Sequence, residues 1–338
     1  MSSSDAALSI VRGKVSDRRY GLCCKKTGGK LGMKNPKHKM TIRERKEARS
    51  GYLFICPWII GFVCLTGGPL LFSLYASFTN YNFTSQMDFV GLENYIRMFF
   101  KDPVFWKALW NTLYYVILAV PLSCICAIFL ASLLNQKVKG TGIFRMLFYL
   151  PTVLSGVAVY QLWILLLSPQ SGLINSVLRL VGIEGPAWLS DPAWTKPSLA
   201  LMRIWALGTS MLLYLSSMNS VPKELYEVAD IDGASFMQKF RRITLPQISP
   251  IIFFDLITSM TGAFQVFQEA LVMSKNGKGD PAGSLLFYNL HIYEEAFTHY
   301  DMGYACAMAW FLLVIVLLIT LINLVCSKYW VHTEGGEV

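Results

Sequence analysis

The chain has 338 residues, of which 54% are hydrophobic and 15% are charged, and its formal net charge is +9. Soluble domains carry about 25% charged residues, so this composition excludes an ordinary water-soluble protein. We therefore expect a membrane protein, whose organisation is better counted in spans than in soluble domains.

The N-terminal stretch, residues 1–50, is polar and basic, with fourteen Lys and Arg before the first apolar run. It lacks a helical period until Thr41, so we predict a largely disordered tail. From Thr41 onward, "TIRERKEARSG" predicts a short helix leading to the membrane. The first apolar run is too long for a signal peptide, and we interpret it as a retained span.

Six apolar segments have the roughly 20 residues that a helix needs to cross a bilayer. They run over residues 53–78, 113–134, 146–167, 199–218, 251–273 and 305–326. Such long, continuous runs favour helices over barrel strands, whose side chains alternate. The sequence thus predicts an all-α, polytopic membrane protein with a six-span domain over residues 51–338.

The distribution of Lys and Arg predicts the orientation of these spans. The tail, two alternate loops and the C-terminus hold 22 of them, whereas the other three loops hold 7. Because cytoplasmic loops carry the excess, we expect both termini to be cytoplasmic. We interpret the basic tail as part of this signal, and expect no nucleic-acid partner.

The residues that usually form metal or catalytic sites are scattered. The eight cysteines include no CxxC pair, and the four histidines, at positions 38, 291, 299 and 332, lie outside the spans. We predict neither a metal site nor a catalytic centre, and we interpret the cysteines as reduced thiols.

The loop between spans four and five, residues 220–250, is unusually ordered for a connection. Ser220 is predicted to cap a first helix, Gly233 to end it in the left-handed conformation, and a second helix to begin near Ser235. Pro246 and Pro250 then introduce span five. Such a stiff element suits the transmission of force from a partner.

This loop also resembles a known pattern, E-A-A-x3-G-x9-I-x-L-P, of the permease subunits of ATP-binding-cassette importers. The matching residues are Glu227, Ala229, Gly233, Ile243, Leu245 and Pro246. Val228 departs from the pattern, where the family often has Ala. The resemblance covers residues 45–332. Over this range the chain is similar to the larger subunit of maltose- and glycerol-phosphate-type permeases.

The resemblance implies a mechanism without bond chemistry on this chain. It implies a second homologous permease subunit, two ATPase subunits that use ATP and Mg, and an extracytoplasmic substrate-binding protein, in a bacterial cell membrane. The coupling residues would be the six matching positions together with Asp230. The sequence has no G-x4-G-K-[ST] phosphate loop, which agrees with ATP being bound elsewhere and no cofactor being bound here.

The resemblance further implies uptake of a carbohydrate, with an oligosaccharide favoured, and a path between spans four and five. The candidate polar side chains are Thr209, Ser210, Ser259, Gln265 and Gln268. Ser259 matches a sugar-contacting position of the maltose-type subunit, but "GAFQVFQ" replaces its Asn-rich run. These polar groups could equally form hydrogen bonds between helices.

Three charged residues, Arg203, Asp255 and Glu269, interrupt the spans. A proton relay is one interpretation, and pairing within the bundle or a place near the span ends is the one we favour. The alternatives for the whole chain are a permease of the same class for glycerol phosphate or another small polar solute, a secondary transporter subunit, and an integral membrane enzyme.

Overall fold

The computed structural model describes residues 42–83, 87–136, 140–274 and 277–331, with side chains from residue 51 onward. The regular secondary structure of these residues is helical, and apart from one isolated bridge, Thr79 to Phe89, they contain no strand pairing. The predicted disordered tail falls on residues 1–41, outside the described residues. The chain divides into two units, Met1–Gly61 and Phe62–Val338.

The first unit contributes helix α1 (Ile42–Phe62), which begins where the sequence predicts a helix leading to the membrane. A turn of π-helix, η1 (Val63–Gly67), and α2 (Gly68–Ala76) belong to the second unit and continue the helical backbone. The stretch Gly51–Ala76 is long and apolar enough to form one membrane span.

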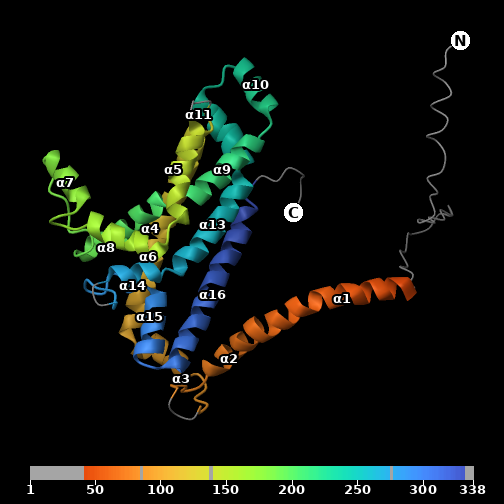
Figure 1. Ribbon diagram of the computed structural model, residues 1–338, viewed down its shortest axis with the longest axis vertical. Helices are drawn as coiled ribbons and strands as arrows, with labels where there is room; N and C mark the ends of the chain where they lie inside the picture. Colours follow the sequence, from red (N-terminus) through yellow and green to blue (C-terminus); the bar gives the residue numbers. More distant parts are fainter. Residues whose placement is uncertain (1–41, 84–86, 137–139, 275–276, 332–338) are drawn as a thin grey trace. The chain divides into compact units, whose positions relative to one another are not determined.

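Helix α4 (Pro103–Leu134) is the central element of the second unit (Figure 1). Its 32 residues reach about 48 Å at 1.5 Å per residue, so it extends well before the predicted span 113–134. Asp102 caps its start by accepting from the backbone N–H groups of Val104 and Phe105. Helices α8 (Pro192–Trp205), α9 (Gly208–Ser220) and α13 (Ser249–Phe264) all pack against α4.

Three of the predicted spans are bent rather than straight. The third consists of α5 (Thr141–Val153) and α6 (Gly156–Leu166), which meet at 102°, and the fourth of α8 and α9, which meet at 48°. The first bend arises because Leu154 and Ser155 have extended backbones, with ψ of 150° and 126°. The hydropathy of a sequence window depends on its composition alone, so it does not predict where the helix axis changes direction.

The fifth predicted span, 251–273, differs most from the structure. The helix entering it bends by 66° before Ser249, and α13 already ends at Phe264. A separate short helix, α14 (Gln268–Met273), follows. Together with Gly51–Ala76, α4 and α16 (Met302–Ser327), the bent pairs give up to six spans among the described residues.

The remaining helices are short and connect the spans. Before α4 lie α3 (Glu93–Ile96) and η2 (Arg97–Lys101), and α7 (Leu173–Leu180) follows α6. Between α9 and α13 lie α10 (Lys223–Ile231), α11 (Phe236–Lys239), η3 (Phe240–Thr244) and α12 (Leu245–Gln247). Before α16 lie α15 (Tyr288–Tyr293) and η4 (Glu294–Thr298).

The second unit has two hydrophobic cores. The larger core is rich in aromatic side chains and draws on the first half of α4, α6, α8, α14, α15 and α16; it includes Phe105, Tyr115 and Tyr288. The smaller core lies around the second half of α4, α9 and the start of α13, and includes Tyr214 and Ile248. In Figure 1, α10 and α11 lie at one end of α9 and α13, and α3 lies beside the start of α16 at the other end.

Candidate functional site

A cavity of about 560 Å³ opens where α13 gives way to α14. The helix ends at Phe264, and Phe267 has a non-helical backbone before Gln268 starts α14. This break turns polar and aromatic side chains toward one space. Its polar lining is Gln265, Gln268, Glu269 and Asn289, and its aromatic lining is Tyr160, Phe267, Tyr293 and Phe297.

A second cavity of about 290 Å³ shares Tyr160 and Glu269 with the first. Its wall includes Arg203 at the end of α8, Tyr115 of α4 and Trp205. The bend of the third span forms another part of the wall. The two cavities together thus present hydroxyl, amide, carboxylate and aromatic groups from four different spans.

The two charged groups of this wall are held by neighbours. Arg203 donates from Nη2 to the backbone carbonyl of Ser259 at 3.1 Å, and its side chain lies close to the Tyr115 hydroxyl. The Glu269 carboxylate interacts with the Tyr160 hydroxyl. The arrangement therefore fixes one positive and one negative group at the cavity without joining them in a direct ion pair.

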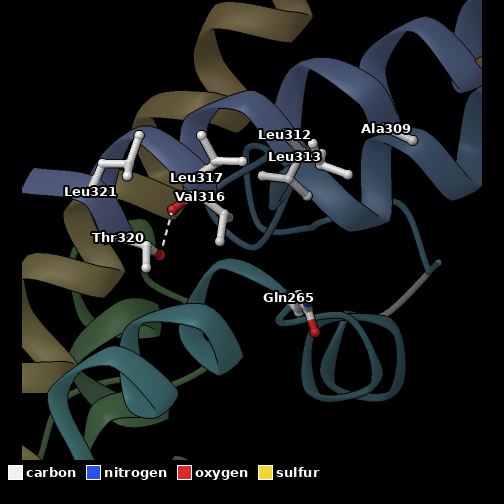
Figure 2. A pocket seen from close by; sticks show the side chains of 8 residues that line it. All are labelled: Gln265, Ala309, Leu312, Leu313, Val316, Leu317, Thr320 and Leu321. Atoms are coloured by element: carbon white, nitrogen blue, oxygen red, sulfur yellow. Dashed lines mark hydrogen bonds between the residues drawn. The ribbon is translucent and has the colours of Figure 1, made fainter. Parts of the chain in front are cut away.

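A groove of about 430 Å³ along α16 adjoins the first cavity through Gln265 (Figure 2). Its remaining lining is aliphatic apart from Thr320, whose hydroxyl donates to the Val316 carbonyl at 2.8 Å within the same helix. Gln265 is solvent-accessible in the isolated chain. A polar amide exposed beside an apolar helix face is costly against lipid, so this face needs cover from water or protein.

The five residues predicted to line a substrate path do not converge. Gln265 and Gln268 line the larger cavity. Ser210 instead donates to Asp255 at 2.8 Å, so its hydroxyl already has a partner. Thr209 and Ser259 line neither of the two cavities described above.

Sequence reasoning missed Asn289 and Tyr293, which reach the cavity from α15. Both belong to the connection between the fifth and sixth predicted spans, residues 274–304. The only signal for them was the amphipathic pattern of that segment. Glu269 was noticed as a charged span residue, but its place at the shared wall depends on the break between α13 and α14.

The segment 220–250 folds as two short helices around a tight turn, as predicted. Gly233 has φ of +72°, a left-handed backbone that favours glycine, and a Cβ there would meet no neighbour within 4 Å. Ser235 caps α11 in a capping box with Gln238. Lys239 and Asp230 form an ion pair of 2.6 Å that links the second helix to the first.

The predicted cap at Ser220 is wrong. Its hydroxyl donates to the Ser216 carbonyl at 3.1 Å, so Ser220 remains the last residue of α9. Helix α10 begins after Pro222, which supplies no side-chain cap. A serine can bond back to its own helix as readily as it caps the next one, and the sequence does not separate these cases.

The surface of segment 220–250 carries exposed apolar side chains: Val228, Ile231, Phe236 and Met237. Ile231 alone keeps 86% of its surface exposed. Beside them, a hollow of about 360 Å³ is lined by Gly233, Gln238 and Arg242 among others. Apolar patches rimmed by polar residues mark interaction surfaces. Of the motif residues, Glu227, Asp230 and Leu245 are exposed, and Ala229, Ile243 and Pro246 are partly buried.

At the end of the second unit opposite segment 220–250, polar contacts join segments that are distant in the sequence. Asp102 accepts from the Tyr304 hydroxyl at 2.7 Å and lies 3.1 Å from Nε2 of His291. Burial alone would raise the pKa of Asp102, but the hydrogen bonds from Tyr304, His291 and the Phe105 N–H lower this pKa below its ordinary value.

Arg97 forms the second contact at this end. It pairs with Asp301 and Glu295 and lies 4.1 Å from the ring centroid of Tyr304. Burial lowers the pKa of Arg97, but the hydrogen bond to Asp301 and the two acidic charges outweigh it, so the pKa is raised. The start of α16 is thereby tied to the segment before α4.

The comparisons with known proteins agree with this geometry. The family model described as "Binding-protein-dependent transport system inner membrane component" matches residues 105–328. The probable ABC transporter permease YesP of Bacillus subtilis is 43% identical over 87% of this chain and 95% of its own. The arabinooligosaccharides transport permease AraP of the same species is 33% identical over 82% and 88%.

Among solved structures, a bacterial ABC transporter involved in the import of the acidic polysaccharide alginate matches with a TM-score of 0.75. It is 25% identical over 85% of this chain and 97% of the matched chain. The family's transport systems place ATP hydrolysis on a separate subunit, so the chain is not itself an enzyme. The chain belongs to the inner membrane components of binding-protein-dependent transport systems, the multi-pass permease subunits of ABC importers.

Proposed function

We propose that this chain forms half of the membrane pathway through which an ABC importer takes up an oligosaccharide. The observation that carries the proposal is the pair of adjoining cavities, where Gln265, Gln268 and Asn289 meet the rings of Tyr160 and Tyr293. Amides both donate and accept hydrogen bonds, as sugar hydroxyls do, and aromatic rings cover the apolar faces of sugar rings. Relatives named for arabinooligosaccharide and lactose transport support this ligand class.

A small anionic solute such as glycerol phosphate fits the cavities less well. Arg203 is the one cation in the lining of the two cavities, and Glu269 lies in the same wall. A phosphate of about two negative charges near pH 7 would meet a wall without net positive charge. A ligand that is recognised through hydroxyl groups suits this balance of charge better.

A second permease subunit completes the pathway in this proposal. The larger cavity is open on one side, and Gln265 lies exposed between it and the groove along α16. A homologous subunit would cover this face, enclose the amide and supply the opposite wall. We infer a heterodimer, because the chain resembles one member of a two-permease pair.

Segment 220–250 is the proposed contact with the ATPase, which binds ATP and Mg. The exposed Val228, Ile231 and Phe236 supply an apolar surface for docking, and Glu227 and Asp230 supply charge at its rim. Gly233 allows the turn that presents both helices together. With this segment in the cytoplasm, both chain termini lie there too, and an extracytoplasmic binding protein delivers the ligand at the opposite end.

The test is reconstitution of the complete importer in nanodiscs with its binding protein. ATP hydrolysis is measured with arabino-oligosaccharides, lactose, alginate oligosaccharides and glycerol 3-phosphate. We expect stimulation by at least one saccharide. Stimulation by glycerol 3-phosphate with none by any saccharide would overturn the assignment of ligand class.

A further inference from the structure

The buried carboxylate of Asp255 lies in α13 outside both cavities. It is 6% exposed, and each of its oxygens accepts a hydrogen bond from α9. Ser210 Oγ donates to Oδ1 at 2.8 Å, and the Tyr214 hydroxyl donates to Oδ2 at 2.5 Å. A carboxylate is costly to bury without such partners, so the two hydroxyls hold α13 against α9.

The same contact reaches a third helix. The Tyr214 hydroxyl lies 3.2 Å from Sγ of Cys124 in α4, and Tyr214 is fully buried. The contact lies within the smaller core, which also contains Val221 and Ile248 at the two ends of segment 220–250. Asp255 therefore sits where the spans and this segment share one core.

The position of Asp255 along its helix is significant. The backbone bends by 66° just before α13, and α8 and α9 meet at 48°. Asp255 comes seven residues after Ile248, about 10 Å along the chain, and ten residues before Gln265, about 15 Å further. It thus lies between the bend next to segment 220–250 and the face that carries the cavity.

When one of two helices joined by a bend is displaced, the bend can change its angle and leave the other helix in place. A direct contact between the helices on either side prevents this. Arg203 provides another tie, but it reaches the Ser259 carbonyl from α8, beyond the bend between α8 and α9. Asp255 is bonded to α9 itself, the helix that leads directly into segment 220–250. It can therefore keep the two straight helices together while the segments outside them turn.

We propose that Asp255 is a positioning residue that makes α9 and α13 move as one unit. Displacement of segment 220–250 by the ATPase is then carried past the bend at Ile248 to the cavity face. This inference rests on the coupling role proposed above for that segment. It assigns Asp255 no contact with the transported solute.

The experiment uses the assembled importer in nanodiscs and needs no saccharide. A reporter cysteine replaces Gly262, an exposed residue of α13 whose added Cβ would meet no neighbour within 4 Å. Its reaction rate with a maleimide is measured by mass spectrometry of the peptide, with and without ATP, Mg and vanadate. In the otherwise unchanged protein, trapping should change the rate by at least about fivefold, the low end of typical coupling between sites.

Asp255→Asn should keep ATP hydrolysis but lose most of this ATP-dependent change, because one hydroxyl loses its acceptor. Tyr214→Phe and Ser210→Ala should each lose part of it. The matched control is Ser123→Ala, a buried serine of α4 that donates to Val120 within its own helix; it should keep the full change. Asp255→Glu should restore part of the response.

If Asp255→Asn responds like Ser123→Ala, the proposal is overturned, even if the variant melts at a lower temperature. Should that variant not assemble, full responses from both Tyr214→Phe and Ser210→Ala overturn it equally. If Gly233→Pro abolishes the change while Asp255→Asn keeps it, the coupling segment stands and only the role of Asp255 fails. The absence of any ATP-dependent change in the unchanged protein would overturn both.

Discussion

The two ends of the second unit are built in different ways. At the end that contains Arg97 and Asp102, side chains from far-apart segments pair with one another, as Arg97 does with Asp301 and Glu295. At the end that contains segment 220–250, the contacts are local, such as the capping box at Ser235 and the ion pair between Lys239 and Asp230.

The two ends thus differ in how far apart in the sequence their contacting residues lie. The first end pairs Arg97 with two carboxylates and packs the rings of Phe99, Phe105 and Phe311 together, although Phe100 there is exposed. Segment 220–250 leaves Ile231 and Phe236 exposed although it is locally rigid. A rigid element with an apolar surface is prepared for a partner, whereas the opposite end holds the spans in place.

The largest effect is expected from Gly233→Pro. The Gly233 backbone N–H donates to the Asp230 carbonyl at 3.1 Å, and its φ is +72°. Proline removes the donor and requires φ near −65°, so the turn between the two short helices cannot form. Membrane insertion should persist while uptake in vesicles falls by more than about tenfold, the loss expected when about 1.4 kcal/mol of coupling is removed.

Gly233→Asn is the matched control, because asparagine tolerates the left-handed conformation better than other residues. Nothing lies within 4 Å of a Cβ at this position, so crowding is not a factor. Uptake should be largely retained in this variant. Normal uptake by Gly233→Pro would refute the coupling role of segment 220–250.

The next effect is expected at the cavity, from Gln268→Leu. Leucine has a similar size but cannot hydrogen-bond, so the half-saturating saccharide concentration for stimulated ATP hydrolysis should rise about tenfold, the equivalent of about 1.4 kcal/mol. Hydrolysis without saccharide should not change. Thr320→Val is the control in the neighbouring groove, since its hydroxyl is satisfied within α16; equal shifts in both variants would contradict a specific contact.

Features of the two ends that depend on neighbouring residues could be predicted from the sequence, whereas those that depend on contacts between distant residues could not. The helix–turn–helix of segment 220–250, with the left-handed Gly233 and the start near Ser235, follows from local residue preferences and is confirmed. The bends of the third, fourth and fifth spans were missed, because a continuous apolar run looks the same whether straight or bent.

The polar contacts between helices were still harder to predict from the sequence. Ser210 was a candidate for the path, yet it bonds to Asp255 of another helix. Asp255 and Arg203 were expected to pair within the bundle or to lie near the span ends, and each finds a partner on the facing helix. Gln265 and Gln268 were predicted as polar groups of one span, but Asn289 meets them only because α15 folds back to the break after α13. Such partners follow from tertiary packing, which one sequence does not encode in any local pattern.

A smaller effect is expected at the end that contains Asp102, from Arg97→Met. The substitution removes two ion pairs and the contact with the Tyr304 ring, but Arg97 keeps 41% of its side-chain surface exposed. We therefore expect a loss of about 1–2 kcal/mol in stability, seen as a lower melting temperature of the chain in detergent. Arg179→Met, which loses bonds only to nearby carbonyls of Asn175 and Gln170, should melt closer to the unchanged protein; the reverse order would contradict the role given to this end.

The smallest effect is limited to acid pH and concerns Asp102. Because the pKa of its carboxyl is lowered in the folded state, its stabilising contribution is present above the unfolded pKa of about 3.9 and is lost as the pH falls through the folded value. Asp102→Asn keeps the helix cap, since asparagine caps as well as aspartate, but removes the charge that faces His291 and Tyr304. The difference in melting temperature between the unchanged protein and Asp102→Asn should be constant from about pH 5 to 7. It should shrink as the pH falls below about 4. A gap that widened on acidification would show that the Asp102 charge destabilises this end, and that its closure depends on the neutral contacts instead.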